Sequence, residues 1–117
     1  MNRKVVDGWY EAFRSKDMSK VRLAKDFVHT SPFGEIKGRD VYLDMVEANA
    51  GVFFSKKIDI IDVIDGGDKF AVRYRVNQMP VCEVIHVRNG EILRIDAYYH
   101  IGEKPVIPAL SRWYSAQ

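Results

Sequence analysis

The chain has 117 residues, enough for one domain with a core of its own. Hydrophobic residues make up 47% and charged residues 29%, a balance typical of a folded protein rather than a disordered one. The formal net charge is only +2 and no basic run exceeds two residues, which argues against nucleic acid as a partner.

The first residues, MNRKVVDGWYEAF, contain no apolar stretch of the kind found in a secretion signal. No window of the chain approaches the ~18 consecutive apolar residues that a membrane span needs. The single cysteine, Cys82, cannot form an internal disulfide and fits a reducing compartment. We therefore expect a cytoplasmic protein without a membrane partner.

An amphipathic helix is predicted at the start of the chain. Its apolar residues recur three and four positions apart, which places them on one face: Val5, Val6, Trp9, Tyr10 and Phe13. The segment Ser15-Lys16-Asp17 breaks this pattern. A second, shorter helix is predicted from Met18 to Ala24, with Asp17 as its N-cap.

A short strand over residues 27–30 is predicted next, followed by a turn at SPFG. Because side chains alternate along a strand, Phe27, His29 and Ser31 should share one side. A third helix is predicted to begin at Gly38-Arg39-Asp40 and to end at Gly51.

The segments KIDIIDVID and KFAVRYRVN flank Gly66-Gly67 and predict a β-hairpin. A two-residue turn at these glycines pairs Asp59 with Tyr74, which would place Asp59 on the inner side of the sheet. An odd-numbered loop around Gln78-Met79-Pro80 would then place Arg75 opposite Glu83.

The strongest hairpin pattern is VCEVIHVRNGEILRIDAYYHI, with Asn89-Gly90 as its turn. A two-residue turn predicts the pairs Arg88–Glu91, His86–Leu93, Val84–Ile95 and Cys82–Ala97. In this register His86 is the single imidazole on an otherwise apolar face. A proton-exchanging group in apolar surroundings is a candidate for catalysis.

The opposite face of this hairpin is mixed and has two interpretations. One is a solvated face, since exposed ion pairs contribute little to stability. The other is a self-associating face that would form a homodimer, with Ile85, Val87 and Ile92 at its centre. Its rim would contain Arg73, Arg75, Glu83, Asp96, Tyr98 and His100. The tail 104–117 should pack on the body or on a second subunit.

Three features together resemble the nuclear-transport-factor-2-like superfamily, in its SnoaL-like and ketosteroid-isomerase-like branch. They are DFVHTSPFGEIKGRD followed by a helix, the segment VCEVIHVRNGEILRIDAYYH, and the aromatic first helix. The resemblance covers roughly residues 4–101. It implies an α+β, cystatin-like cone in which a curved mixed sheet wraps around three N-terminal helices, as one domain over 1–117. It also implies a cavity for a small apolar ligand and a homodimer.

The isomerase motifs of this branch place Ser31 at the position of the base, Trp9 at that of the helix tyrosine, and His86 at that of the second oxyanion donor. A serine without a partner cannot act as a base, and an indole N–H is only a donor. The resemblance therefore does not favour the usual ketosteroid isomerase mechanism. The cyclases often end the last strand in an aspartate, a position that resembles His100 here.

The candidate catalytic residues are His86, His29 and Asp59. His86 has an alternative role as a core histidine bonded to a tyrosine hydroxyl. His29 is poorly placed to activate Ser31, because neighbours on one strand face lie about 7 Å apart. A zinc site would need three or four converging ligands, and only Asp59 could join the two histidines. No metal or cofactor is expected.

The expected ligand is a small, mostly apolar or carbonyl-containing molecule. Its predicted contacts are Trp9, Phe13, Phe27, Ser31, Phe33, Met45, Tyr74 and Tyr99. The expected function is proton transfer on this ligand by an isomerase-like or polyketide-cyclase-like enzyme, or by a related lyase or hydrolase. The alternative is a non-catalytic, dimeric ligand-binding or interaction module, and the fold does not decide between them.

Overall fold

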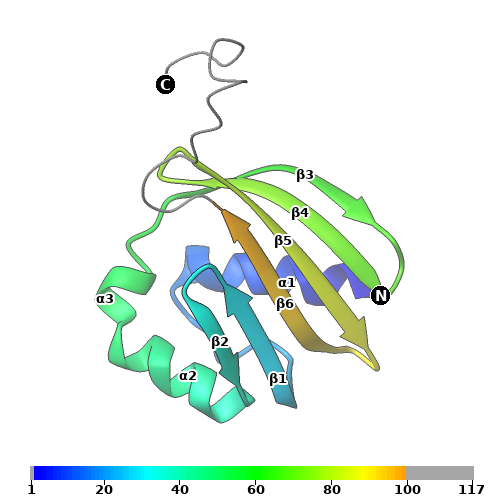
Figure 1. Ribbon diagram of the computed structural model, residues 1–117, viewed down its shortest axis with the longest axis horizontal. Coiled ribbons are helices and arrows are strands. Elements are labelled where there is room, and N and C mark those ends of the chain that lie inside the picture. Colours follow the sequence, from blue (N-terminus) through cyan, green and yellow to red (C-terminus); the bar gives the residue numbers. More distant parts are fainter. Residues whose placement is uncertain (1, 100–117) are drawn as a thin grey trace, which may run out of the picture.

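The computed structural model describes residues 2–99, which form three helices and six strands (Figure 1). The helices are α1 (Asn2–Ser15), α2 (Arg39–Ala48) and α3 (Ala50–Phe53). The strands are β1 (Leu23–Ser31), β2 (Gly34–Lys37), β3 (Ile58–Asp65), β4 (Lys69–Val76), β5 (Met79–Arg88) and β6 (Glu91–Tyr99). The predictions for His100 and for the tail 104–117 lie outside the described residues.

The strands form one mixed sheet in the order β2-β1-β6-β5-β4-β3. All neighbouring strands are antiparallel except β1 and β6, which are parallel. Helix α1 crosses behind β4, β5 and β6 in Figure 1 and packs on β3, β5 and β6, whereas α2 packs on β1 and β2. We call the side of the sheet that faces α1 its inner face. Within residues 2–99, no helix is long and apolar enough to cross a membrane.

Helix α1 forms as its apolar periodicity predicts. Its buried residues are Val6, Trp9, Tyr10 and Ala12, and the Arg3–Asp7 ion pair lies on its exposed side. The apolar stripe of α1 therefore covers the inner face of the sheet.

The predicted helix over Met18–Ala24 is wrong, because Leu23 and Ala24 are the first residues of β1 and are buried. The N–H of Ile92 donates to the carbonyl oxygen of Arg22 over 2.7 Å, which holds this segment beside β6. A helix of seven residues has a costly nucleus and gains little by itself. Leu23 therefore pairs with the central strand β6 instead of belonging to a helix.

The chain between β1 and β3 follows the prediction with two differences. The turn at Pro32-Phe33 leads into β2, a short strand that was not predicted and that pairs with the end of β1. The predicted third helix begins at Arg39 but is two helices, α2 and α3, which are separated at Asn49. The predicted end at Gly51 is wrong, because α3 continues through it to Phe53.

A bulge in β6 changes the register of the β5–β6 hairpin. Around the turn the pairing is as predicted, and Asn89 and Gly90 have φ of 53° and 74°, as a two-residue hairpin turn requires. The register then shifts by one residue between His86 and Val87. The remaining predicted pairs are therefore wrong, and the observed ones are His86–Arg94, Val84–Asp96, Glu83–Ala97 and Cys82–Tyr98.

The shift inverts β5 relative to the prediction, because a slip of one residue moves every side chain to the other face. Glu83 now faces the core, and His86 lies on the outer face. The predicted centre of a self-associating face is wrong for the same reason, since Ile85, Val87 and Ile92 are buried in the core of this chain.

Two further register differences affect the predicted site. A bulge between Ile60 and Asp62 brings Asp59 opposite Arg75, so the predicted inward position of Asp59 is wrong. The turn between β4 and β5 contains two residues instead of an odd number, and it places Arg75 opposite Pro80 rather than Glu83.

Candidate ligand-binding site

A cavity of about 470 Å³ lies between the inner face of the sheet and the helices, a volume within the range of small-molecule sites. Its wall includes seven of the eight predicted ligand contacts: Trp9, Phe13, Ser31, Phe33, Met45, Tyr74 and Tyr99. The eighth, Phe27, is fully buried in the core and does not line the cavity. Ligand binding by these residues stays a prediction.

Aromatic rings from all three helices and from β1 form one side of this cavity. The ring of Phe13 lies edge-on to Trp9 at 5.3 Å and stacks on Phe53 at 5.2 Å. The imidazole of His29 lies 5.1 Å from the ring of Tyr42. Such contacts hold an apolar wall rigid and leave few polar groups exposed to a ligand.

Glu83 is the one buried charged or polar side chain among residues 2–99, and it lines the cavity with 4% of its surface exposed. Its carboxylate accepts hydrogen bonds from Trp9 Nε1 at 3.2 Å and from the Tyr10 hydroxyl at 2.9 Å. Tyr74 also donates to it. Both donors from α1 therefore fix the helix against the centre of β5.

Burial raises the pKa of Glu83 by disfavouring the charged carboxylate, and the hydrogen bonds from Tyr10, Trp9 and Tyr74 oppose this effect only in part. Burial beside this carboxylate also raises the pKa of Tyr10 and of Tyr74, so both hydroxyls stay protonated as donors. Relative to an exposed carboxyl group, Glu83 is thereby shifted toward its protonated form, the form that can donate a proton into the cavity.

His29 lines the cavity from β1, on the side predicted for it. Burial lowers the pKa of its imidazole to about 4, and the charge of Lys56 adds to this effect while Asp96 opposes it. The imidazole is therefore neutral near pH 7 and can accept a proton.

His86 and Asp59 do not line the cavity. The inward orientation predicted for His86 is wrong, because the bulge in β6 places it on the outer face. There it lies opposite Arg94, whose Nε donates to Asp96 at 2.9 Å, and Thr30 Oγ1 donates to the same carboxylate at 2.6 Å. Among the described residues, no group of three or more His, Cys, Asp or Glu side chains could hold a metal ion.

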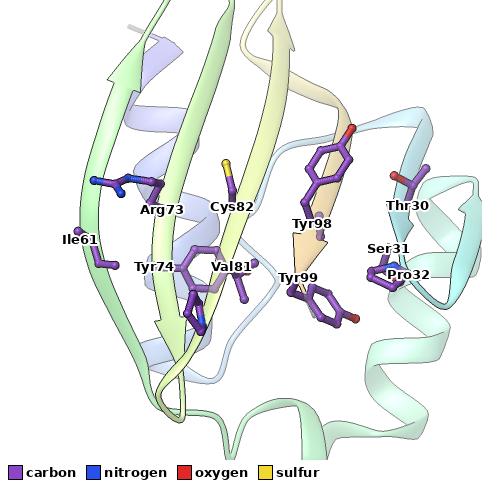
Figure 2. Close-up of a pocket in the computed structure, with 12 residues that line it drawn as sticks. Thr30, Ser31, Pro32, Ile61, Arg73, Tyr74, Val81, Cys82, Tyr98 and Tyr99 are labelled. Atoms are coloured by element: carbon purple, nitrogen blue, oxygen red, sulfur yellow. The ribbon is translucent and has the colours of Figure 1, made fainter. Parts of the chain in front are cut away.

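A second hollow, of about 620 Å³, lies at the end of the sheet where β5 begins (Figure 2). It is lined by side chains from both faces, including Tyr99 from the inner one and Cys82 and Tyr98 from the outer one. Its cation, Arg73, donates to Asp62 at 2.8 Å and is exposed. Because this hollow contains no buried polar group, the first cavity is the better candidate site.

Glu83 was predicted to lie on the outer face and was not predicted as a site residue. Two patterns could have identified it. On β5 the odd positions contain three aliphatic residues, Val81, Ile85 and Val87, whereas the even ones contain Cys, Val, His and Arg. On β6 two isoleucines three positions apart, Ile92 and Ile95, require a bulge if both are to reach the core.

Comparison with known proteins supports the fold. Residues 6–95 match the model of the SnoaL-like domain family. A SnoaL-like protein of unknown function from Burkholderia thailandensis superimposes with a TM-score of 0.74 and 18% identity, covering 85% of this chain and 93% of that one. No curated protein matches the chain.

Two structurally similar proteins are described as candidate polyketide cyclases. IdmH from Streptomyces antibioticus has a TM-score of 0.68 and 19% identity, covering 85% of this chain and 91% of that one. A protein from Sinorhizobium meliloti has a TM-score of 0.69 and 17% identity, covering 80% and 93%. These likenesses confirm the predicted α+β cone fold. Because the family model spans most of the sequence, the chain belongs to the SnoaL-like domain family.

Proposed function

We propose that this protein binds a small, mostly apolar carbonyl compound in the cavity and transfers a proton on it. The observation that carries this proposal is the position of Glu83, a carboxyl group buried in the wall of an otherwise aromatic cavity. Buried acids cost free energy, and such groups gather at functional sites. The description of two similar proteins as candidate polyketide cyclases agrees with this class of reaction.

Glu83 and His29 suit the two roles that such a reaction needs, an acid at the carbonyl oxygen and a base at the adjacent carbon. Neutral Glu83 donates a hydrogen bond to the carbonyl oxygen of the ligand, and neutral His29 takes a proton from the adjacent carbon. The C–H bond breaks, its electron pair moves toward the oxygen, and the proton passes to the imidazole. From there it either returns to the product or exchanges with solvent, and solvent then supplies the proton that is returned to carbon. Enzymes that transfer protons beside a carbonyl group often pair one group that must be protonated, the acid, with one that must be unprotonated, the base.

The test is hydrogen exchange at carbon in 2-tetralone, a bicyclic ketone, followed by NMR in D₂O. The protein should accelerate exchange, and Glu83→Gln and His29→Gln should each lower the acceleration by about 10²-fold or more. The rate should rise with pH as His29 loses its proton, near pH 4, and fall again once Glu83 ionises. His86→Gln, outside the cavity, is the matched control and should exchange like the unaltered protein. No acceleration by the unaltered protein would remove the proposed reaction.

The second candidate function is a non-catalytic ligand-binding module. One observation favours it. The hydroxyl of Ser31 accepts a hydrogen bond from the N–H of Phe33 at 3.1 Å. This hydroxyl therefore stabilises the β1–β2 turn, which is a structural role rather than a catalytic one. It predicts that 2-tetralone binds, by calorimetry, without any exchange. Met45→Trp, which fills the cavity from α2, should abolish binding, whereas Asp44→Trp on the exposed side of α2 should not.

We further propose that a second copy of the chain covers the outer face of the sheet. In residues 2–99 the helices all contribute to the inner side, and the outer side presents Tyr98, which is 61% exposed, beside half-buried Val84. Opposite charges alternate around them, with the pairs Arg73–Asp62 and Arg94–Asp96. A face of this kind can be complementary to itself across a two-fold axis.

A further inference from the structure

Lys56 is the one basic residue of Lys or Arg type among the described residues that line the cavity. It follows α3 and precedes β3, and its Nζ lies 5.0 Å from the centre of the Phe53 ring. That ring stacks on Phe13, which also lines the cavity. The ammonium group is therefore positioned at the rim of the aromatic wall, where a cation is attracted to the face of a ring.

Within residues 2–99, no protein carboxylate pairs with the charge of Lys56. Among the described residues, no carboxylate oxygen lies within 4.0 Å of its Nζ. Its positive charge nevertheless acts on the interior. Burial raises the pKa of Glu83 and lowers that of His29, and the charge of Lys56 opposes the first effect and adds to the second.

The interior that faces Lys56 favours uncharged groups. Burial disfavours the charged forms of both Glu83 and His29, and the rest of the lining is aromatic, aliphatic or hydroxyl-bearing. An occupant with an apolar body would thus meet a neutral interior and one cation at the rim. A second anionic charge on the occupant would find no further cation among these lining residues.

We propose that the ligand is a monoanionic carboxylate with an apolar body, whose carboxylate binds the ammonium group of Lys56. This inference rests on the proposed function and narrows it to one class of substrate. The apolar body lies along the aromatic wall, and the carbonyl group that reacts lies at the other end, toward Glu83. One lysine matches one negative charge, and because Lys56 is exposed, the desolvation cost of the ion pair is low.

The test compares two probes of the same shape, 2-naphthoate and the neutral 2-naphthamide, by isothermal titration calorimetry at pH 7. The unaltered protein should bind both probes, with 2-naphthoate bound more tightly by about two- to fivefold, as expected for one exposed ion pair. Lys56→Met keeps the apolar stem and removes the charge, so this preference should disappear while the affinity for 2-naphthamide stays within about twofold. Added salt should weaken 2-naphthoate binding to the unaltered protein more than to Lys56→Met.

Lys57→Met is the matched control, because Lys57 is the next residue, is exposed and does not line the cavity. It should retain the preference for 2-naphthoate. Equal affinities for the two probes in the unaltered protein, or an equal loss in Lys57→Met, would overturn the role of Lys56 and leave the cavity as a binding site. Failure of both probes to bind would overturn the role of Lys56 together with the proposed ligand binding.

Discussion

At the scale of single residues, Glu83 combines two effects that oppose each other. Three donors, from Trp9, Tyr10 and Tyr74, stabilise its charged form, while burial in an aromatic core disfavours that form more strongly. The pKa of this carboxyl group is therefore higher in the folded state than in the unfolded state. Part of the pH dependence of the protein's stability should therefore come from this side chain.

Glu83→Gln should change how stability varies with pH. The folded pKa of Glu83 lies above its ordinary value of 4.5, so the folded state binds more protons than the unfolded state above that pH. Stability due to this group is fully present below pH 4.5 and decreases as pH rises toward the folded pKa. The variant lacks this decrease and should gain stability relative to the unaltered protein as pH rises above 4.5, measured by urea unfolding. Parallel stability curves would contradict the raised pKa, and Glu91→Gln in the exposed turn is the control.

His29→Gln should change how stability varies with pH in the opposite direction, between pH 4 and 6.5. The pKa of His29 falls from 6.5 to about 4 on folding, so the unfolded state binds more protons between these values. The unaltered protein should lose up to roughly 3 kcal/mol of stability through this group as pH falls from 6.5 to 4. The variant should not show this loss in urea unfolding at the two pH values. An equal loss in the variant would show that His29 is not the group responsible.

At the scale of elements, the two bulges decide which side chains reach the cavity. The one in β6 brings Ile92 and Ile95 to the core together and turns Glu83 inward, and the one in β3 turns Asp59 outward. A bulge inserts one unpaired residue and so reverses the alternation beyond it.

The Asn89-Gly90 turn was predictable, because this dipeptide has few alternatives. The predicted two-residue turn at Gly66-Gly67 is wrong, since Asp65 pairs with Phe70, which leaves four residues between them. The extra residues inside the strands were not predictable either.

The hairpin between β3 and β4 offers a test at this scale. A Cβ atom on Gly66 would lie 2.6 Å from the carbonyl oxygen of Lys69, so Gly66→Ala must displace backbone in the turn. We expect it to lower the free energy of unfolding by about 1–3 kcal/mol. Gly8→Ala in α1, where nothing lies within 4 Å of the added Cβ, should instead raise stability by up to ~1 kcal/mol. Chemical denaturation of both variants checks this difference, and an unaffected Gly66→Ala would show that the turn can relax.

At the scale of the whole molecule, the outer face of the sheet determines the expected assembly. Val84 lies near its middle, on a central strand, opposite Asp96. Val84→Lys places a charge where the second copy would pack, and the like charges would meet across a two-fold axis. We expect the unaltered protein to sediment as a dimer and the variant as a monomer with unchanged circular dichroism.

Val52→Lys is the control for this measurement, because Val52 is 71% exposed on α3, away from the outer face. It should leave the dimer intact. A monomer for the unaltered protein at all concentrations, or dissociation by both substitutions, would contradict an interface on this face.

The sequence by itself determined the number and order of the strands after Gly51, the amphipathic α1, and five of the aromatic residues that line the cavity, Trp9, Phe13, Phe33, Tyr74 and Tyr99. These features follow from local periodicity and turn chemistry, which depend on neighbours in the chain. Only the tertiary structure decided that residues 23–31 pair with β6 instead of forming a helix, and that Glu83 rather than His86 faces the cavity. Both outcomes depend on strand pairing between distant segments, where one unpaired residue in a strand changes the face of every residue beyond it.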